Sequence, residues 1–353
     1  MHRHARSGWL PDLPQVSTLP RSVLVLYEGL GAGARPDELD TVVQVRQVTE
    51  AIEKLNWAAS AEEVDLNLGR TLEHLVQTRP NCIFNLVESL NGRGELIGVV
   101  PALLESTAIP FTGSGSDAIN LSSQKILAKR WMRLHDIPTP DWLTAAEAAD
   151  ERREGNRTWI VKSLWEHASL GLDDASVVQG HVAARQRLNH CTERHGGTWF
   201  AEQYIDGREF NISIIEQNGQ PYVLPIAEMT FVDYPPEKPR IVGYPAKWDQ
   251  SAPEYTATQR RFAVLDADVR EQLTAVSKRC WALFGLRGYA RVDIRMDSEN
   301  IPWVLEVNAN PCLSHDAGFA AAATEAGFRY RQVIDMVLHA ALRPVLPVLR
   351  RAG

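Results

Sequence analysis

The sequence lacks the long features that mark membrane, secreted and nucleic-acid-binding proteins. Its 353 residues contain no apolar run of the length that a bilayer span requires. The first residues, MHRHARSGWLPDLPQ, carry positive charge but no apolar segment of the kind found in signal peptides. The net charge is −7 and no long basic run occurs, which argues against nucleic acid as a partner. We therefore expect a cytoplasmic protein with no membrane or nucleic-acid partner, although a local lysine cluster could still bind a nucleotide.

Cysteine is scarce, and its spacing carries no metal or redox pattern. Cys82, Cys191, Cys280 and Cys312 form neither a C-x-x-C motif nor a zinc-binding set, so we expect reduced thiols, mostly in packing roles. The glycine-rich stretch GLGAG at 29–33 is an incomplete version of G-x-G-x-x-G. A plain turn is favoured there over a dinucleotide site.

The composition is that of a soluble globular protein of two or three domains, with 44% hydrophobic and 23% charged residues. Apolar runs at 22–27 and 81–87 predict two buried strands, and the apolar spacing over 38–58 predicts a helix between them. A strand, a glycine turn, a helix and a second strand indicate an α/β unit with a parallel sheet. The proline-containing residues 1–20 are expected to be a flexible lead-in.

Two alternating runs near the C-terminal end, at 289–296 and 303–308, predict a β-hairpin. A turn near Glu299-Asn300 would place Asp293 opposite Glu306 and Arg291 opposite Asn308, on one face. Opposed carboxylates repel, and a bound Mg²⁺ ion would remove that conflict. Arg291 beside such a site could stabilise an anionic transition state. The alternative is an ordinary solvated face of a sheet.

Lysines in two further segments are candidates for phosphate binding. Lys162 ends an apolar run at 158–163 and precedes a loop of small residues at 166–172, whose amides could cover a phosphate. The alternative for Lys162 is a lysine that protects an edge strand. Lys125 lies in a predicted helix, where exposed lysines are common.

Several ordered segments resemble the D-alanine–D-alanine ligase branch of the ATP-grasp carboxylate–amine ligases. They are IPFTGSG at 109–115, SSQKILAK at 122–129, VKS followed by EHASLG at 161–171, AEQYIDGREFN at 201–211, and the hairpin with Asn308 and Asn310-Pro311. The resemblance covers roughly 81–327. It implies an α/β (α+β) ATP-grasp fold. An N-terminal parallel α/β domain comes first in the chain, and the central and C-terminal domains that follow hold ATP between them. The implied domains are 21–120 (N-terminal), 121–206 (central) and 207–350 (C-terminal), the last with a mobile loop at 233–255.

The resemblance also implies roles for individual residues. The implied phosphate ligands are Lys125, Lys162 and Lys247. The implied adenine and ribose contacts are Glu202, the backbone of Gln203, Tyr204 and Ile205, and Glu209. The implied catalytic residues are Arg291, Lys247 and Ser169 of the phosphate-covering loop. The implied ligands of two Mg²⁺ ions, or of Mn²⁺ in their place, are Asp293, Glu306 and Asn308.

The sequence departs from these ligases where they recognise their substrates. Their TxPGMTxxS run is replaced by ANPCLSHDA at 309–317, which puts Cys312 at the position of a glycine, and their early GGxSxEHEVS segment is missing. We therefore expect an ATP-dependent ligase that forms an amide bond through an acyl phosphate, on small carboxylate and amine substrates other than a D-alanine pair. Glu88, His315 and Asp316 are the candidate substrate contacts, and family habit suggests a homodimer.

Three alternatives remain open at this point. The chain could be a D-alanine–D-alanine ligase proper, a nucleotide-binding protein that has lost ligation, or a carboxylate kinase that stops at the acyl phosphate. The Arg291, Asp293, Glu306 and Asn308 set argues against the loss of ligation.

Overall fold

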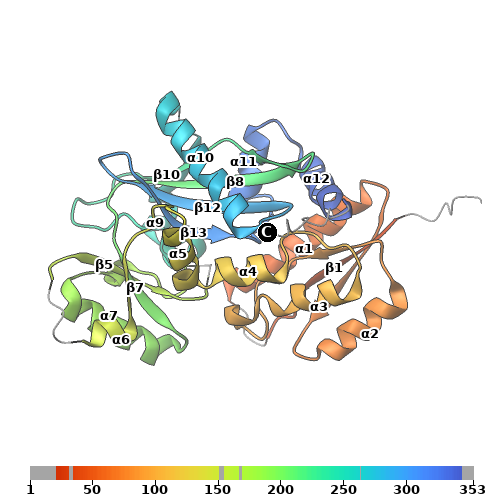
Figure 1. The fold of residues 1–353 in the computed structure, drawn as a ribbon, viewed down its shortest axis with the longest axis horizontal. Helices are drawn as coiled ribbons and strands as arrows, with labels where there is room; N and C mark the ends of the chain where they lie inside the picture. Colours follow the sequence, from red (N-terminus) through yellow and green to blue (C-terminus); the bar gives the residue numbers. More distant parts are fainter. Residues whose placement is uncertain (1–20, 32–34, 151–154, 167–168, 263, 344–353) are drawn as a thin grey trace, which may run out of the picture.

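Three sheets organise the molecule. A computed structural model describes residues 21–31, 35–150, 155–166, 169–262 and 264–343, and within them the strands form sheets of three, six and four strands. Figure 1 shows the three-stranded sheet and its helices in red and orange, the four-stranded sheet in yellow and green, and the six-stranded sheet above both. Each sheet lies within one of the three ranges predicted as domains, while the boundaries themselves stay a prediction. The predicted lead-in at 1–20 lies outside the described residues.

The first sheet is parallel, as the sequence predicts, with the order β2-β1-β3. Its elements are β1 (Ser22–Glu28), α1 (Pro36–Glu53), β2 (Ala58–Val64), α2 (Leu68–Thr78), β3 (Cys82–Asn85) and α3 (Val99–Thr107). The apolar residues of β1 and β3 are buried, which is typical of parallel strands covered on both faces. The predicted helix at 38–58 begins and ends earlier, at Pro36 and Glu53, because Ala58 already belongs to β2. That edge strand, AASAEEV, was not predicted because it carries few apolar residues.

The second sheet is antiparallel, with the order β4-β7-β5-β6. The elements of this part are α4 (Ser116–Ser123), α5 (Lys125–Leu134), β4 (Trp142–Thr144), α6 (Ala145–Ala149), β5 (Thr158–Ser163), β6 (Val177–Gln179), α7 (Gly180–His195) and β7 (Trp199–Gln203). A small core between the sheet and α7 contains Trp159, Val161, Leu188 and Trp199. This sheet presents Lys162 and Glu202 on neighbouring strands.

The third sheet is also antiparallel, with the order β11-β10-β8-β12-β13 and with β9 paired to β8. Its strands are β8 (Arg208–Gln217), β9 (Gln220–Val223), β10 (Ala227–Phe231), β11 (Thr258–Phe262), β12 (Tyr289–Met296) and β13 (Pro302–Asn308). The helices of this part are α8 (Tyr244–Trp248), α9 (Pro253–Ala257), α10 (Ala267–Phe284), α11 (Gly318–Glu325) and α12 (Tyr330–Leu342). The predicted loop at 233–255 is therefore interrupted by two short helices, both with proline in the first turn, where its fixed φ suits a helix start.

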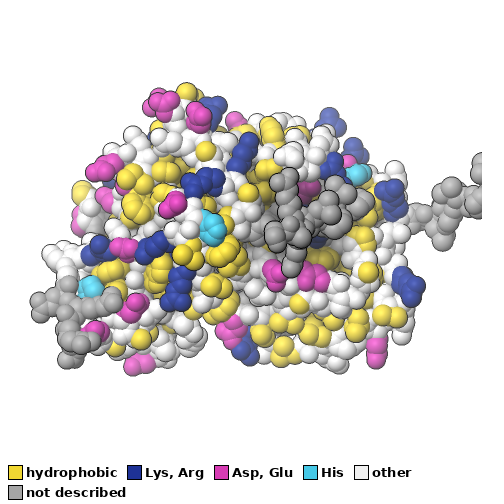
Figure 2. Space-filling model, viewed as in Figure 1, with side chains coloured by type: hydrophobic (Ala, Val, Ile, Leu, Met, Phe, Trp, Pro, Cys, Tyr) yellow, Lys and Arg dark blue, Asp and Glu magenta, His cyan; other side chains and the backbone are white. Residues whose placement is uncertain are grey.

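The last helices share a core with the first sheet. Val25 and Phe84 of the first sheet belong to one buried cluster with Tyr289 of β12, Phe319 of α11 and Val337 of α12. On the face drawn in Figure 2, acidic and basic side chains are interspersed rather than gathered by sign. The N-terminal sheet therefore packs directly against β12 and the last two helices.

Candidate active site

The hairpin of β12 and β13 has the predicted register. Asp293 is paired with Glu306, and Arg291 is paired with Asn308. After Asp293 the register shifts, so that Ile294 is paired with Val304. The alternation of β12 and the turn at 297–300 therefore sufficed to predict which side chains share this face.

Arg291 compensates much of the charge between the opposed carboxylates. Its Nε and Nη2 atoms donate to the two carboxylate oxygens of Asp293 at 2.7 and 2.9 Å. Asn211 of β8 donates to Asp293 Oδ1 at 2.9 Å. Burial lowers the pKa of Arg291 and the neighbouring Asp293 raises it, and the net direction is upward. The guanidinium thus stays charged at any pH relevant to a protein.

Two predicted phosphate lysines lie beside the same carboxylates. Lys125, only 6% exposed, has its Nζ 4.0 Å from Glu306 Oε2 and donates to the Glu166 carbonyl at 2.7 Å. Lys247 reaches the region from α8. Its pKa is lowered, first by burial and then by the charge of Arg291, while Asp293 and Glu306 oppose that shift. Lysines from α5 and α8 are thereby brought to the carboxylates of the hairpin.

The donor set of the hairpin suits a hard divalent cation. Asp293, Glu306 and the amide oxygen of Asn308 are oxygen ligands, and Mg²⁺ takes one or two carboxylates together with phosphate oxygens. The Asn308 oxygen accepts a hydrogen bond from the Asn310 backbone at 2.9 Å, which orients it. Over the described ranges no group of three or more histidines, cysteines or acids gathers as a metal site. A metal at this face would therefore need the triphosphate to complete its ligands.

Glu202 lies between two lysines, a contact that the resemblance did not imply. Lys162 Nζ lies 2.6 Å from Glu202 Oε1, and Lys129 Nζ lies 2.5 Å from Glu202 Oε2. Glu202 is 1% exposed and Lys129 is fully buried. Burial raises the pKa of Glu202, the two lysines lower it, and the net direction is downward. Sequence reasoning gave Lys129 no role, although it is placed one helical turn after Lys125.

The predicted adenine strand is partly engaged by the protein itself. The backbone N–H groups of Gln203 and Tyr204 donate to the carbonyls of Asp141 and Thr158 at 2.8 and 3.0 Å. These two donors are therefore already occupied, which leaves the N–H of Ile205 and the strand carbonyls for the adenine contact that the resemblance implies. Of the three residues whose backbone was expected to contact adenine, two thus have an N–H group that is already hydrogen-bonded within the protein.

Arg295 joins that strand end to the predicted ribose ligand. Its Nη1 donates to the Ile205 carbonyl at 2.8 Å, and its Nε and Nη2 donate to Glu209 Oε2 at 3.1 and 2.8 Å. Arg295 was missed by the sequence reasoning. The signal was there, because Arg295 alternates with Arg291 and Asp293 along one strand.

The phosphate-covering loop and the segment 233–255 touch one another. Ser169, in the left-handed region at φ 62°, donates to the Val242 carbonyl at 3.0 Å. The Tyr244 backbone donates to the Leu172 carbonyl at 2.9 Å, and Lys238 Nζ lies 3.1 Å from Asp174 Oδ2. His167 and Ala168 of this loop lie outside the described residues. The Ser169 hydroxyl therefore points to the segment 233–255, the implied mobile loop, which we call the lid segment.

Helix α1 holds the segment that replaces the family's substrate loop. Asp40 accepts from the Cys312 thiol at 3.2 Å and from the Ser314 hydroxyl at 3.3 Å. Gln44, one turn further along α1, accepts from the Leu313 backbone, and Gln47 accepts from the His315 backbone at 2.8 Å. This contact was missed, since the partners are 268 to 274 residues apart in the chain and no local pattern joins them.

Of the three predicted substrate residues, Glu88 lies near buried side chains, whereas the other two are exposed. Glu88 lies close enough to Cys312 and Tyr289 to raise the pKa of each, after burial as the larger cause. The ring of His315 packs edge-on against Tyr330, with centroids 4.1 Å apart. The Asp316 carbonyl accepts from Arg260 at 3.2 Å, and both His315 and Asp316 are exposed. Glu88 is thus the one of the three whose charge acts on the interior of the loop.

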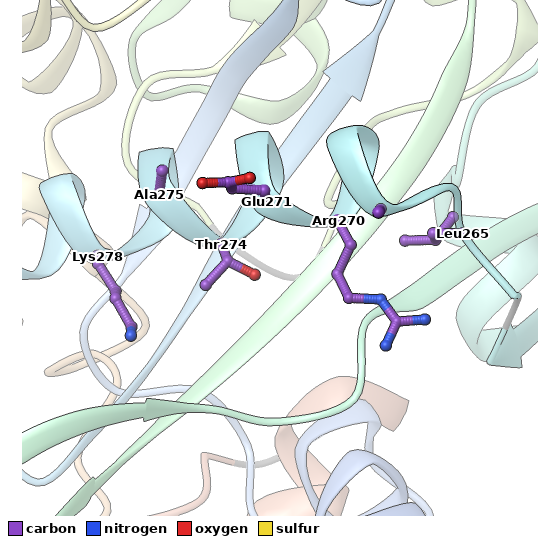
Figure 3. Close-up of a pocket in the computed structure, with 7 residues that line it drawn as sticks. Leu265, Arg270, Glu271, Thr274, Ala275 and Lys278 are labelled. Carbon is purple, nitrogen blue, oxygen red and sulfur yellow. The ribbon is translucent and has the colours of Figure 1, made fainter.

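A separate hollow on the surface has no part in this constellation. Figure 3 shows side chains that extend from one face of α10 and from the residues before it, among them Leu265, Arg270, Glu271, Thr274 and Lys278. None of the predicted site residues lines this hollow.

Comparisons with known proteins agree with the geometry. The profile of the family described as "D-ala D-ala ligase C-terminus" matches residues 135–339. The protein y4sG of Sinorhizobium fredii (strain NBRC 101917 / NGR234) is 28% identical over 302 residues, which cover 84% of this chain and 86% of y4sG. The D-alanine–D-alanine ligase of Synechococcus sp. (strain JA-3-3Ab) is 28% identical over 323 residues, which cover 89% of this chain and 93% of that ligase.

The solved structures support the same fold. The D-alanine–D-alanine ligase of Bacillus anthracis complexed with ATP superposes with a TM-score of 0.68 at 21% identity, covering 92% of this chain and 98% of that one. The architecture is accordingly that of an ATP-grasp protein. In the part of the chain that the structure describes, no helix is both long and apolar enough to cross a membrane. Because the family profile matches more than half of the sequence, the chain belongs to the D-alanine–D-alanine ligase family of ATP-dependent ligases, which form C–N bonds.

Proposed function

We propose that the chain joins the carboxylate of one amino-acid-type substrate to the amine of another, and that the pair is not D-alanine with D-alanine. The observation that carries this proposal is the contact between α1 and the segment 309–317. Cys312 and Ser314 both donate to Asp40, and the backbone of Leu313 and of His315 is held by glutamines. A loop with residues that differ from the family pattern, held in this way by α1, presents a different surface to the substrate.

The first step transfers the γ-phosphoryl group of ATP to the carboxylate substrate. The carboxylate oxygen attacks phosphorus, the bond to ADP breaks, and an acyl phosphate forms. Phosphoryl transfer depends on positioning and on compensation of charge. Lys125, Lys162 and Lys247 supply that positive charge, and the first and last already lie beside the hairpin carboxylates. When bound, Mg²⁺ held by Asp293, Glu306 and Asn308 neutralises phosphate charge.

The second step forms the amide bond. The amine nitrogen attacks the carbonyl carbon of the acyl phosphate, the tetrahedral oxyanion collapses, and phosphate leaves while the nitrogen loses a proton. Arg291 supports this step because its guanidinium stays protonated and is fixed by two hydrogen bonds to Asp293. Ser169 and its loop close the phosphate side against the lid.

The substrates are expected to carry an amino group near the anionic side of the loop. Asp40 and Glu88 both act on the Cys312 thiol and raise its pKa, after burial as the main cause. An ammonium group is attracted to this negative charge. Arg291 interacts electrostatically with Cys312, so a carboxylate is favoured near this cation. A free amino acid carries both groups.

The product mass formed from ATP, Mg²⁺ and a mixed amino-acid pool tests this proposal, with ADP release measured for each amino acid singly. We expect a dipeptide or cyclised amide and a rate that depends on an amino acid other than D-alanine. Strong turnover with D-alanine alone would refute the substrate part. ATP binding without carboxylate-dependent hydrolysis would refute ligation as well.

A further inference from the structure

Lys129 is a cation in a fully buried position. It lies on α5, has no exposed surface, and contacts two oxygen groups. Its Nζ donates to Thr139 Oγ1 at 2.9 Å and lies 2.5 Å from Glu202 Oε2. Burying a charge is costly unless it is paired and hydrogen-bonded, so such a lysine has a specific electrostatic task.

Lys129 contacts both the central sheet, through Glu202, and a residue hydrogen-bonded to the C-terminal hairpin, Thr139. Thr139 donates through the same hydroxyl to the Val304 carbonyl at 2.8 Å, and the Val304 backbone donates to the Pro138 carbonyl at 2.8 Å. Val304 lies on β13, two residues before Glu306. Glu202 lies on β7 of the central sheet. Lys129 thus connects the hairpin of the predicted metal site to the central sheet that carries Lys162.

The two oxygens of Glu202 are divided between two lysines. Oε1 faces Lys162 at 2.6 Å and Oε2 faces Lys129. If Lys162 turns to a phosphate, Glu202 remains ionised in the interior only because Lys129 stays with it. Without Lys129, the buried carboxylate would hold Lys162 more tightly, and a bound triphosphate would have to compete for that lysine.

We propose that Lys129 is a positioning residue that holds the charge of Glu202 and thereby leaves Lys162 free for the phosphates of ATP. The inference rests on the proposed phosphate role of Lys162. Burial lowers the pKa of Lys129 to about 8, and the charge of Glu202 opposes that shift. Glu202 is thus the carboxylate that keeps this buried lysine protonated. Lys129 touches no reacting atom and acts through Glu202.

The test compares the binding of ATP and of adenosine by calorimetry. Adenosine has no phosphates, so the proposal expects Lys129→Met to weaken ATP by about tenfold or more and to leave adenosine unchanged. The double variant Glu202→Gln with Lys129→Met is compared with Glu202→Gln alone, because Glu202 is itself an implied adenine contact. In that background the loss of Lys129 should cost little further ATP affinity, because the neutral amide no longer captures Lys162. Arg133→Met is the matched control. Arg133 lies one turn further along α5, its side chain is 50% exposed, and it pairs with Asp141.

Three outcomes overturn the inference: unchanged ATP binding by Lys129→Met, an equal loss of ATP and adenosine, or a loss of ATP affinity by Lys129→Met that is just as large in the Glu202→Gln background. If Lys129→Met does not fold, Thr139→Val decides instead, and a loss of ATP affinity that spares adenosine is expected there too. Lys162→Met separates this inference from the proposed function. If that variant binds ATP normally, the phosphate assignment fails, whereas a loss with Lys162→Met but none with Lys129→Met defeats the Lys129 proposal alone.

Discussion

Single side chains in the site are held mainly by opposite charges. Arg291 forms an ion pair with Asp293, Arg295 forms one with Glu209, and Glu202 forms ion pairs with two lysines. The residues involved are largely buried, with Arg295 only 4% exposed. Removing one partner of a buried pair leaves the other charge without compensation, which costs more than the pair contributes. Substitution of one member of these ion pairs should therefore change both the catalytic rate and the positions of the neighbouring side chains.

Replacing Arg291 by lysine keeps the charge but removes the planar pair of donors to Asp293. We expect kcat to fall by about 10²–10³-fold, the size of effect seen when an oxyanion contact is removed. The measurement is steady-state ADP and phosphate release with the preferred substrates. Arg261→Lys on β11 is the control, because Arg261 is exposed and bonds to Gln259. A lysine variant with the activity of the parent would contradict the role given to Arg291.

Three thiols, two of them buried and that of Cys312 partly buried, should be chemically inert. Burial raises the pKa of both Cys82 and Cys280 to about 12, and raises that of Cys312 further. Since the thiolate is the reactive form, iodoacetamide at pH 8 should label none of these three in the folded protein within minutes. Peptide mass mapping before and after urea denaturation measures this. Rapid labelling of Cys312 under native conditions would show that its loop opens away from Asp40.

At the scale of elements, the lid segment is joined to the central part by a lysine. Lys238 Nζ contacts both Asp174 and Glu254, and it lies over the ring of Tyr234 at 5.4 Å. Lys238 thus connects the early part of the segment 233–255 to Glu254 of α9 and to Asp174, which follows the phosphate-covering loop. Its short helices are stabilised by these tertiary contacts rather than by their own length.

Lys238→Ala should loosen this segment. We expect a several-fold rise in KM for ATP, and faster trypsin cleavage within 233–255, because the ion pairs to Asp174 and Glu254 are lost. Lys278→Ala on the exposed face of α10 is the control. Equal cleavage rates in both variants would mean that Lys238 does not restrain the lid.

The turn between β7 and β8 depends on a glycine. A Cβ atom at Gly207 would lie 2.1 Å from the Met296 carbonyl oxygen, and its φ is +156°. Gly207→Ala should therefore lower the free energy of unfolding by about 3 kcal/mol. Gly285→Ala is the comparison, because that glycine has φ +63° but nothing within 4 Å, and it should cost about 1 kcal/mol. Urea denaturation measures both, and equal losses would contradict the steric argument.

At the scale of the whole molecule, the N-terminal sheet and the C-terminal helices are one packed unit. Val23, Val25 and Phe84 share a core with Ile334 and Val337 of α12. The substrate segment at 309–317 is held between them through α1. The N-terminal sheet and α12 must therefore pack against each other before the segment 309–317 can take its native conformation.

Ile334→Ala tests this coupling. Ile334 is fully buried, so its truncation should cost about 2–5 kcal/mol. Hydrogen exchange is expected to rise in β1 and β3 as well as in α12, while the core around Trp159 and Leu188 in the central sheet stays protected. Faster exchange confined to α12 would mean that the two ends open independently.

Local patterns predicted much of this molecule. Alternation and the turn residues predicted the hairpin register that pairs Asp293 with Glu306, since side-chain direction in a strand has a period of two. Apolar runs predicted β1 and β3, and helical spacing predicted α1 within a few residues at each end. Edge strand β2 was missed because its residues are mostly exposed, and the helices in 233–255 were missed because they depend on tertiary contacts.

The order of residues along the chain determined the family, the parallel sheet of the N-terminal part, and the acidic and basic groups that face one another on the C-terminal hairpin, because these depend on spacing over a few residues. Only the tertiary structure decided that Asp40 binds Cys312, that Glu202 is shared by Lys129 and Lys162, and that Arg295 links Ile205 to Glu209. Such contacts join distant segments, and burial then decides which charges must be paired. That information exists only once the chain has folded.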